Sequence, residues 1–218
     1  MPTKYEINTS NTSTHSGHKT IAMKTGIDML SIVEKLKLYD GILVTGCYRT
    51  GSTICGKMLA CDLGYRYTDE WDYIPYPVER CNLIRWLQNF FHKNQQVVLQ
   101  FPIMSSVAHL IASSKVAVVF MQRNLEDIRR SMRKFHLSPQ ENNDVANDCR
   151  YYEEITGISD LDLPAIKSYY WQNYQSKFEH CYVQQYNDLR GHKLWLDKNK
   201  RNGFTVKQTS RRTNKFFL

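Results

Sequence analysis

The chain has 218 residues, of which 42% are hydrophobic and 23% charged, and its 29 basic and 21 acidic side chains give a net charge of +8. This composition is typical of a globular protein that buries a core, and it excludes a wholly disordered chain. At about 150 residues per domain, the length favours one domain with appendages. The basic surplus favours an anionic partner. Net charge alone does not distinguish among nucleic acid, a membrane surface and a phosphorylated or sulfated ligand as that partner.

We expect no membrane segment and no secretory signal. The chain has no run of about 18 apolar residues, and its first residues lack a basic-then-apolar pattern. The cysteines are scattered without a Cys-x-x-Cys pair, which indicates reduced thiols and a cytoplasmic location. They are Cys47, Cys55, Cys61, Cys81, Cys149 and Cys181.

The domain organisation follows from composition along the chain. Residues 1–20 are polar and repeat Asn-Thr-Ser, so we expect a flexible N-terminal arm. A single α/β domain then covers residues 21–218. Its last part, from about residue 198, is basic and aperiodic, and it is either a flexible end or a loop that an anion orders.

Apolar spacing predicts the first elements in chain order. Apolar residues at helical intervals predict an amphipathic helix over 27–38. The apolar run at 42–44 is too short for a buried helix and predicts a central strand. A glycine-containing loop and a helix over 52–63 follow, so this part has the order strand, loop, helix. That order opens a βαβ unit.

The alternation continues towards the C-terminus. It predicts helices over 78–92, 107–112 and 125–135, and strands over 97–99 and 116–121. The stretch 138–163 is polar and acidic, and we expect it to be a surface excursion. An aromatic-rich helix over 164–178 and a strand over 182–186 complete the domain. The fold class is therefore α/β, a three-layer α/β/α arrangement with a mostly parallel central sheet and a P-loop-like strand–loop–helix.

The loop at 45–53 carries the first functional signal. Backbone N–H groups converge there and the following helix presents its positive end, so an anion such as a phosphate is stabilised. Gly46 and Gly51 fit the spacing G-x-x-x-x-G, but Ser52 stands where a nucleotide triphosphatase has lysine. A cation is present instead at Arg49. The structural alternative is a tight turn in which Ser52 or Thr53 caps the helix.

A second signal follows the strongest predicted strand. Arg123 ends that strand, and Ser131 lies eight residues later on the next helix. Both can point above the carboxyl edge of the sheet, where parallel α/β folds bind ligands. A guanidinium with a hydroxyl suits a second phosphate group. No Asp follows this strand to hold Mg²⁺, which argues against metal-dependent phosphoryl transfer.

With both signals, the chain resembles the sulfotransferase family, whose donor is 3′-phosphoadenosine 5′-phosphosulfate. The family's 3′-phosphate site, a strand ending in Arg-Asn with Ser eight residues after the Arg, matches Arg123, Asn124 and Ser131. The stretch 182–189 is similar to the family's late strand ending in Tyr-Glu-Asp-Leu. The family's 5′-phosphosulfate loop, Lys/Arg-Ser/Thr-Gly-Ser/Thr-Thr, matches Arg49, Thr50, Gly51, Ser52 and Thr53.

The resemblance implies transfer of a sulfuryl group to a hydroxyl or amine, with adenosine 3′,5′-bisphosphate as product. Arg49, with Ser52 or Thr53, would stabilise the charge that develops on the departing phosphate. The resemblance implies no metal and no membrane partner, and it does not favour nucleic acid. The acceptor stays open, a carbohydrate being one class that fits.

The general base is the part of the family pattern that differs. Many cytosolic members have His after the strand that follows the first helix, and Gln100 occupies that position here. Other members use a Glu after the first helix, which favours Glu70 as the base. Asp69 and Asp72 are close rivals, and a solvated acidic loop is the structural alternative. We interpret His92 and His109 as structural.

The remaining candidates concern the C-terminus and the late helix. The family folds a basic C-terminal loop over the 3′-phosphate, so the resemblance assigns Arg211 and Arg212 to cofactor binding, although the family's Arg-Lys-Gly pattern is absent. Aromatic residues of the late helix are more consistent with core than with an acceptor pocket. They are Tyr169, Tyr170, Trp171 and Tyr174.

Two other function classes stay open beside a sulfotransferase. The first is a non-catalytic nucleotide- or nucleic-acid-binding protein that retains the phosphate loop. The high basic charge and Gln100 are consistent with it. The second, a P-loop kinase, is disfavoured by Ser52 in place of lysine and by the missing Mg²⁺ carboxylate.

Overall fold

The computed structural model describes residues 29–69, 80–174, 178–197 and 199. The predicted arm at 1–20 and the base candidates Glu70 and Asp72 lie outside the described residues. So do Arg211 and Arg212, together with almost all of the basic C-terminal stretch.

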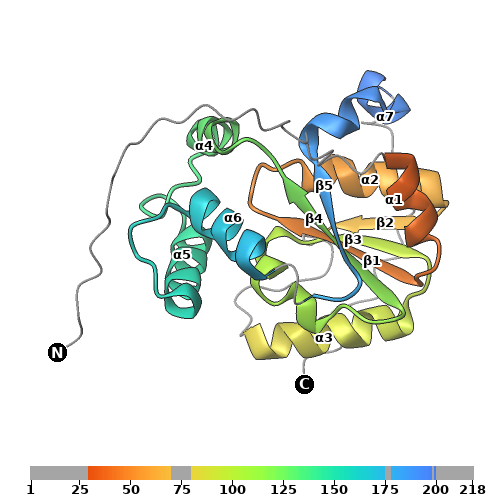
Figure 1. The fold of residues 1–218 in the computed structure, drawn as a ribbon, viewed down its shortest axis with the longest axis horizontal. Helices are drawn as coiled ribbons and strands as arrows, with labels where there is room; N and C mark the ends of the chain where they lie inside the picture. The colour runs from red at the N-terminus through yellow and green to blue at the C-terminus, as the bar shows by residue number, and fades with distance from the viewer. Residues whose placement is uncertain (1–28, 70–79, 175–177, 198, 200–218) are drawn as a thin grey trace, which may run out of the picture.

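A five-stranded sheet forms the middle layer, with the order β2-β3-β1-β4-β5 and every neighbouring pair parallel. The predicted three-layer α/β/α fold is thus confirmed (Figure 1). The prediction missed β2, because it is short and only its two middle residues are buried. The strands are β1 (Gly41–Gly46), β2 (Arg66–Asp69), β3 (Val97–Gln100), β4 (Val116–Gln122) and β5 (Cys181–Gln185).

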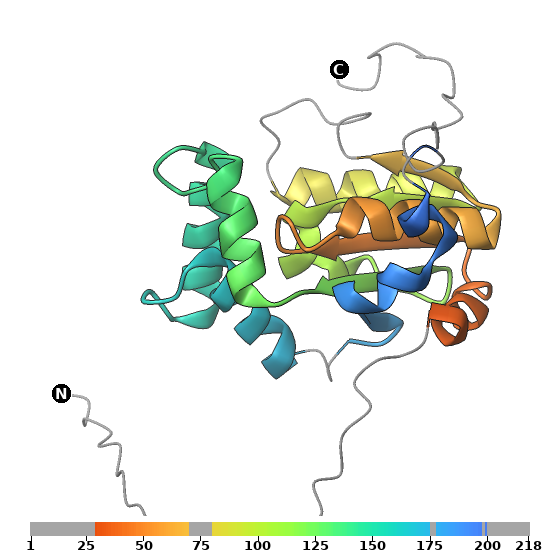
Figure 2. The same cartoon turned by 90° about the horizontal axis from the view of Figure 1, so that it is seen from above.

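Helices cover both faces of the sheet (Figure 2). On one face pack α1 (Met29–Leu36), α2 (Ser52–Leu63) and the short α7 (Lys193–Leu196). On the other pack α3 (Arg80–Lys93), α4 (Leu125–Lys134), α5 (Asn143–Thr156) and α6 (Leu163–Tyr174). Among the described residues, 3₁₀ segments at Pro102–Ser106, Ala108–Leu110 and Tyr186–Gly191 connect these elements.

The prediction of a surface excursion over 138–163 is wrong. This stretch contains α5, which begins after the N-cap Asn142, whose side chain accepts hydrogen bonds from two backbone N–H groups. The helix buries Val145, Asp148 and Tyr152 against α6 and the sheet. These positions are three and four residues apart, so they form one helical stripe. Polar residues on the exposed face obscured that stripe in the sequence.

The parallel register brings all strand ends of functional interest to one edge of the sheet. Gly46 of β1 pairs with Met121 of β4, and Val44 pairs with Gln100 of β3. Asp69, the last residue of β2, pairs with the same Gln100. The loop after β1 therefore lies between the ends of β3 and β4, as ligand sites in parallel α/β folds do. None of the helices within the described ranges is long and apolar enough to span a membrane.

Candidate anion-binding site

The loop after β1 has a backbone that suits close contact with a ligand. Gly51 has φ +92 and is the N-cap of α2, so Ser52 is its first residue and neither Ser52 nor Thr53 caps it. Arg49 also has positive φ, at +65, which is strained for a residue with a side chain. The first N–H groups of a twelve-residue helix thus follow the loop without a side-chain cap.

The hydroxyl groups of this loop have different roles. Thr50 is buried, and its Oγ1 donates to the carbonyl of Cys47 at 2.7 Å, which fixes the turn. Thr53 is exposed on the first turn of α2. Ser52 is buried and faces β3. Of these three hydroxyls, Thr53 is the one open to solvent, while Thr50 shapes the loop.

Two arginines and a serine meet beside the loop. Arg123 donates from Nη1 to the carbonyl of Arg49 at 3.1 Å, and its guanidinium lies 4.1 Å from the ring centre of Tyr186. Arg49 donates from Nε to Ser131 Oγ at 3.0 Å. Its guanidinium lies 4.0 Å from the ring centre of Phe135. The end of β4 and helix α4 therefore converge on Arg49.

The electrostatics of this cluster favour an anion. Packing on Phe135 desolvates the guanidinium of Arg49, and this, together with the charge of Arg123, lowers its pKa. Neither arginine forms an ion pair with any acidic side chain that the structure describes. Two cations held together without a counter-charge repel each other, and a bound phosphate or sulfate group removes that cost.

On the other side of the loop, a carboxylate, an amide and a hydroxyl form a chain. The Gln100 amide lies 3.2 Å from Ser52 Oγ and 3.1 and 3.3 Å from the two carboxylate oxygens of Asp69. Tyr67 donates its hydroxyl proton to Asp69 at 3.0 Å. Gln100 is almost fully buried. Of the base candidates in the described part of the chain, Asp69 is thus connected to the loop through Gln100.

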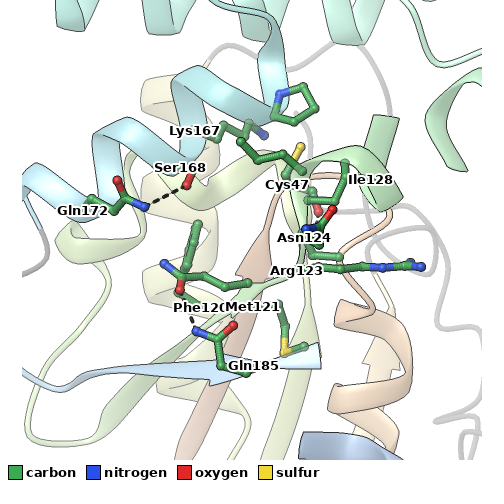
Figure 3. Close-up of a pocket in the computed structure, with 14 residues that line it drawn as sticks. Cys47, Phe120, Met121, Arg123, Asn124, Ile128, Lys167, Ser168, Gln172 and Gln185 are labelled. Atoms are coloured by element: carbon green, nitrogen blue, oxygen red, sulfur yellow. Dashed lines mark hydrogen bonds between the residues drawn. The ribbon is translucent and has the colours of Figure 1, made fainter. Parts of the chain in front are cut away.

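A cavity of about 310 Å³ adjoins the loop on the α6 side of the sheet (Figure 3). It is lined by Thr50 of the loop and by Arg123 of the arginine cluster, although the guanidinium of Arg123 extends away from its centre. Phe120 lies on one wall, and the polar residues that line the cavity besides Thr50, Arg123 and Lys167 are four amides and a hydroxyl. The amides and the hydroxyl are Gln122, Asn124, Ser168, Gln172 and Gln185.

A buried ion pair lies at this cavity. Lys167 of α6 is 0% exposed and pairs with Asp148 of α5, which is 1% exposed. The ammonium also lies 5.0 Å from the ring centre of Tyr48, in the loop. Burial raises the pKa of the neighbouring Cys47 thiol to about 12, so this thiol stays protonated near neutral pH.

The other sequence candidates lie away from the loop. His109 stacks on Phe178 with ring centres 4.4 Å apart, and burial lowers its pKa. His92 is exposed at the end of α3. Tyr170 and Trp171 are buried in the core and donate to backbone carbonyls. Within the described ranges, no group of His, Cys, Asp and Glu is arranged to hold a metal ion.

Sequence reasoning missed several residues that surround the loop. Tyr186 directly follows β5 and packs on both Gly51 and Arg123, which its place in the late motif could have indicated. Phe135, the C-cap of α4, lies four residues after Ser131, about one helical turn, and this spacing is readable from the sequence. The pair of Lys167 and Asp148 carried no sequence signal, because α5 itself was not predicted.

Comparison of the sequence with models of known protein families finds no match, and comparison with curated proteins finds none either.

Proposed function

We propose that the chain is a sulfotransferase that uses 3′-phosphoadenosine 5′-phosphosulfate. The observation that supports this most strongly is the pair Arg49 and Arg123, gathered with Ser131 beside an uncapped helix N-terminus and lacking a counter-charge among the described residues. The donor carries two separate anionic groups, and the chain offers two adjacent sites that suit them.

In this proposal the loop holds the 5′-phosphosulfate. The N–H groups at the start of α2 and the guanidinium of Arg49 would stabilise the charge that develops on the bridging oxygen as sulfur leaves it. Arg123 and Ser131 would hold the 3′-phosphate. Arg123 contacts the carbonyl of Arg49, and Ser131 contacts its side chain. A phosphate bound by Arg123 and Ser131 would therefore also affect the position of Arg49 in the other site.

The base that takes the acceptor proton is Asp69, Glu70 or Asp72. Asp69 is the one whose position supports the proposal, since it ends β2 at the carboxyl edge and connects to Ser52 through Gln100. A carboxylate there would accept the proton as the acceptor oxygen attacks sulfur. The acceptor is a hydroxyl or amine compound, and a carbohydrate is the class we would test first.

A transfer assay with labelled donor and a panel of hydroxyl and amine acceptors tests the function. We expect transfer by the wild type, and loss of about a hundred-fold or more in the rate for whichever of Asp69→Asn, Glu70→Gln and Asp72→Asn removes the base. Asp40→Asn, at the opposite edge of the sheet, is the matched control and keeps its rate. Donor binding without transfer to any acceptor would contradict the catalytic proposal.

A non-catalytic nucleotide-binding protein is the second candidate. One observation favours it: the side chain at the end of β3 is an amide, Gln100, and not a group that can accept a proton in catalysis. The same titration and transfer assays separate the two functions. Binding of adenosine 3′,5′-bisphosphate, with no transfer by the wild type to any acceptor, would establish this candidate.

A further inference from the structure

The hydrogen bonds that link Asp69, Gln100 and Ser52 have a donor-to-acceptor direction, which the proposed function does not use. An amide has a donor end and an acceptor end, so the direction of Gln100 fixes what each neighbour must do. An ionised Asp69 only accepts hydrogen bonds, and it already accepts one from Tyr67. The Gln100 NH₂ group must therefore face Asp69, and its carbonyl must face Ser52 and accept the hydroxyl proton.

This direction works against an anion in the loop. When Ser52 donates its only proton to Gln100, its oxygen has none to donate to a phosphate or sulfate group. It presents lone pairs instead, which an anion does not favour. Ser52 and Gln100 are both buried, so water does not readily replace the bond between them. The charge on Asp69 thus disfavours an anion in the loop in two ways: by direct repulsion, and by fixing the direction of the hydrogen bond between Gln100 and Ser52.

We infer that Gln100 is a positioning residue that couples the charge of Asp69 to the direction of the Ser52 hydroxyl. When Asp69 is neutral, its own proton can be donated to the Gln100 carbonyl. The amide then turns, its NH₂ group donates to Ser52 Oγ, and Ser52 donates to the anion in the loop. Lys57 of α2, whose ammonium lies 5.8 Å from the ring centre of Tyr67, is a further charged group on this side.

The coupling would make Ser52 a hydrogen-bond donor at the moment of transfer. This part rests on the proposed function with Asp69 as base. The acceptor oxygen forms a bond to sulfur, and its proton passes to Asp69. The bond between sulfur and the bridging phosphate oxygen breaks, and its electron pair stays on that oxygen. The proton on Asp69 reverses Gln100, so Ser52 becomes a donor as the departing phosphate gains charge.

A double-mutant cycle separates this relay from simple repulsion between Asp69 and an anion. The probes are pyrophosphate for the loop and adenosine 3′,5′-bisphosphate for the whole donor site, titrated by calorimetry. Asp69→Asn removes the enforced direction, and we expect binding about ten-fold tighter than in the wild type. In a Ser52→Ala background the same change should tighten binding by less than about three-fold, the part due to charge alone.

Two further variants complete the test. Gln100→Met frees Ser52 and keeps the carboxylate of Asp69 in place without a charge change, so it should tighten pyrophosphate binding by a similar factor and make Asp69→Asn nearly silent. Asp40→Asn makes the same charge change at the opposite edge of the sheet and should leave affinity unchanged. Circular dichroism confirms that each variant is folded; Gln100→Met and Ser52→Ala give an independent arm if Asp69→Asn does not fold.

The outcomes distinguish the relay from the proposed function. An equal gain from Asp69→Asn with and without Ser52 overturns the relay and leaves the function standing. Pyrophosphate binding with the expected coupling, but no binding of the bisphosphate, supports the relay and overturns the sulfotransferase proposal. If the wild type binds neither probe, the loop is not an anion site and both are overturned.

Discussion

Two groups of cations contact the loop after β1, and they differ in where their counter-charge comes from. Lys167 is fully buried and pairs with Asp148, so its charge is neutralised within the protein. Arg49 and Arg123 lie together with no acidic partner among the described residues. We infer that Lys167 stabilises the fold and that Arg49 and Arg123 bind an anion. Loss of a side chain should therefore affect stability in one group and binding in the other.

The largest expected effect comes from breaking the buried pair. Lys167→Met leaves the Asp148 carboxylate buried without its cation, which should lower the free energy of unfolding by about 3–5 kcal/mol. Urea unfolding followed by circular dichroism measures it. The double variant Lys167→Met/Asp148→Leu should recover most of the loss, because no charge is then left unpaired. An unchanged free energy of unfolding in the single variant would mean that the ion pair of Lys167 with Asp148 does not stabilise the fold.

The next effect concerns how the arginine cluster is attached to the loop. A Cβ at Gly51 would lie 2.5 Å from the ring of Tyr186, which carries Arg123 on its face. Gly51→Ala should cost about 1–3 kcal/mol of unfolding free energy and weaken nucleotide binding. Gly64→Ala is the matched control, since it also has positive φ but nothing within 4 Å of its Cβ. Equal costs at both glycines would show that Tyr186 does not constrain the loop.

A smaller effect is expected at Ser131, which holds the side chain of Arg49. Ser131→Ala removes the acceptor of the Arg49 Nε–H group and a hydroxyl for the proposed 3′-phosphate. Affinity for adenosine 3′,5′-bisphosphate should fall by roughly five-fold, about 1 kcal/mol, with the unfolding midpoint unchanged. Calorimetric titration measures the affinity. If the unfolding midpoint fell while affinity held, Ser131 would belong with the structural group.

The smallest effect is expected at an ion pair outside both groups. Arg129 of α4 donates to both carboxylate oxygens of Asp162 and lowers its pKa below 3.8, through hydrogen bonds first and charge second. The pair therefore stabilises the fold near neutral pH, and this contribution is lost as the pH falls through the lowered pKa. Because Asp162 is half exposed, Asp162→Asn should cost at most about 1 kcal/mol, and the cost should shrink in high salt. A larger, salt-independent cost would place this pair with Lys167.

The sequence was a good guide to elements that have a continuous pattern. The apolar run at 42–44 lies within β1, and the helix over 52–63 has the bounds of α2, because a glycine precedes it and another follows it. Arg123 and Ser131 were predicted to point to one place above the carboxyl edge of the sheet, and in the structure both contact Arg49. The bonds between them were not predictable, since they depend on rotamers and on the positive φ of Arg49.

Other features depend on contacts between segments far apart in the chain. Asp69 and Gln100 are adjacent only because β2 pairs with β3, and β2 is too short to be recognised from its pattern. Lys167 and Asp148 meet because α5 packs against α6. Charge compensation of this kind is a property of the packed structure, and no local spacing encodes it.

Titration of adenosine 3′,5′-bisphosphate into the wild type and Arg123→Ala tests the central claim most directly. Arg130→Ala is the control, because it removes an exposed cation of α4 outside the cluster. The account predicts that the wild type binds, that Arg123→Ala weakens binding at least about ten-fold, or 1.4 kcal/mol, and that Arg130→Ala changes it little. No binding by the wild type, or equal loss in both variants, would contradict the claim that this cluster is a specific site for the donor's phosphates.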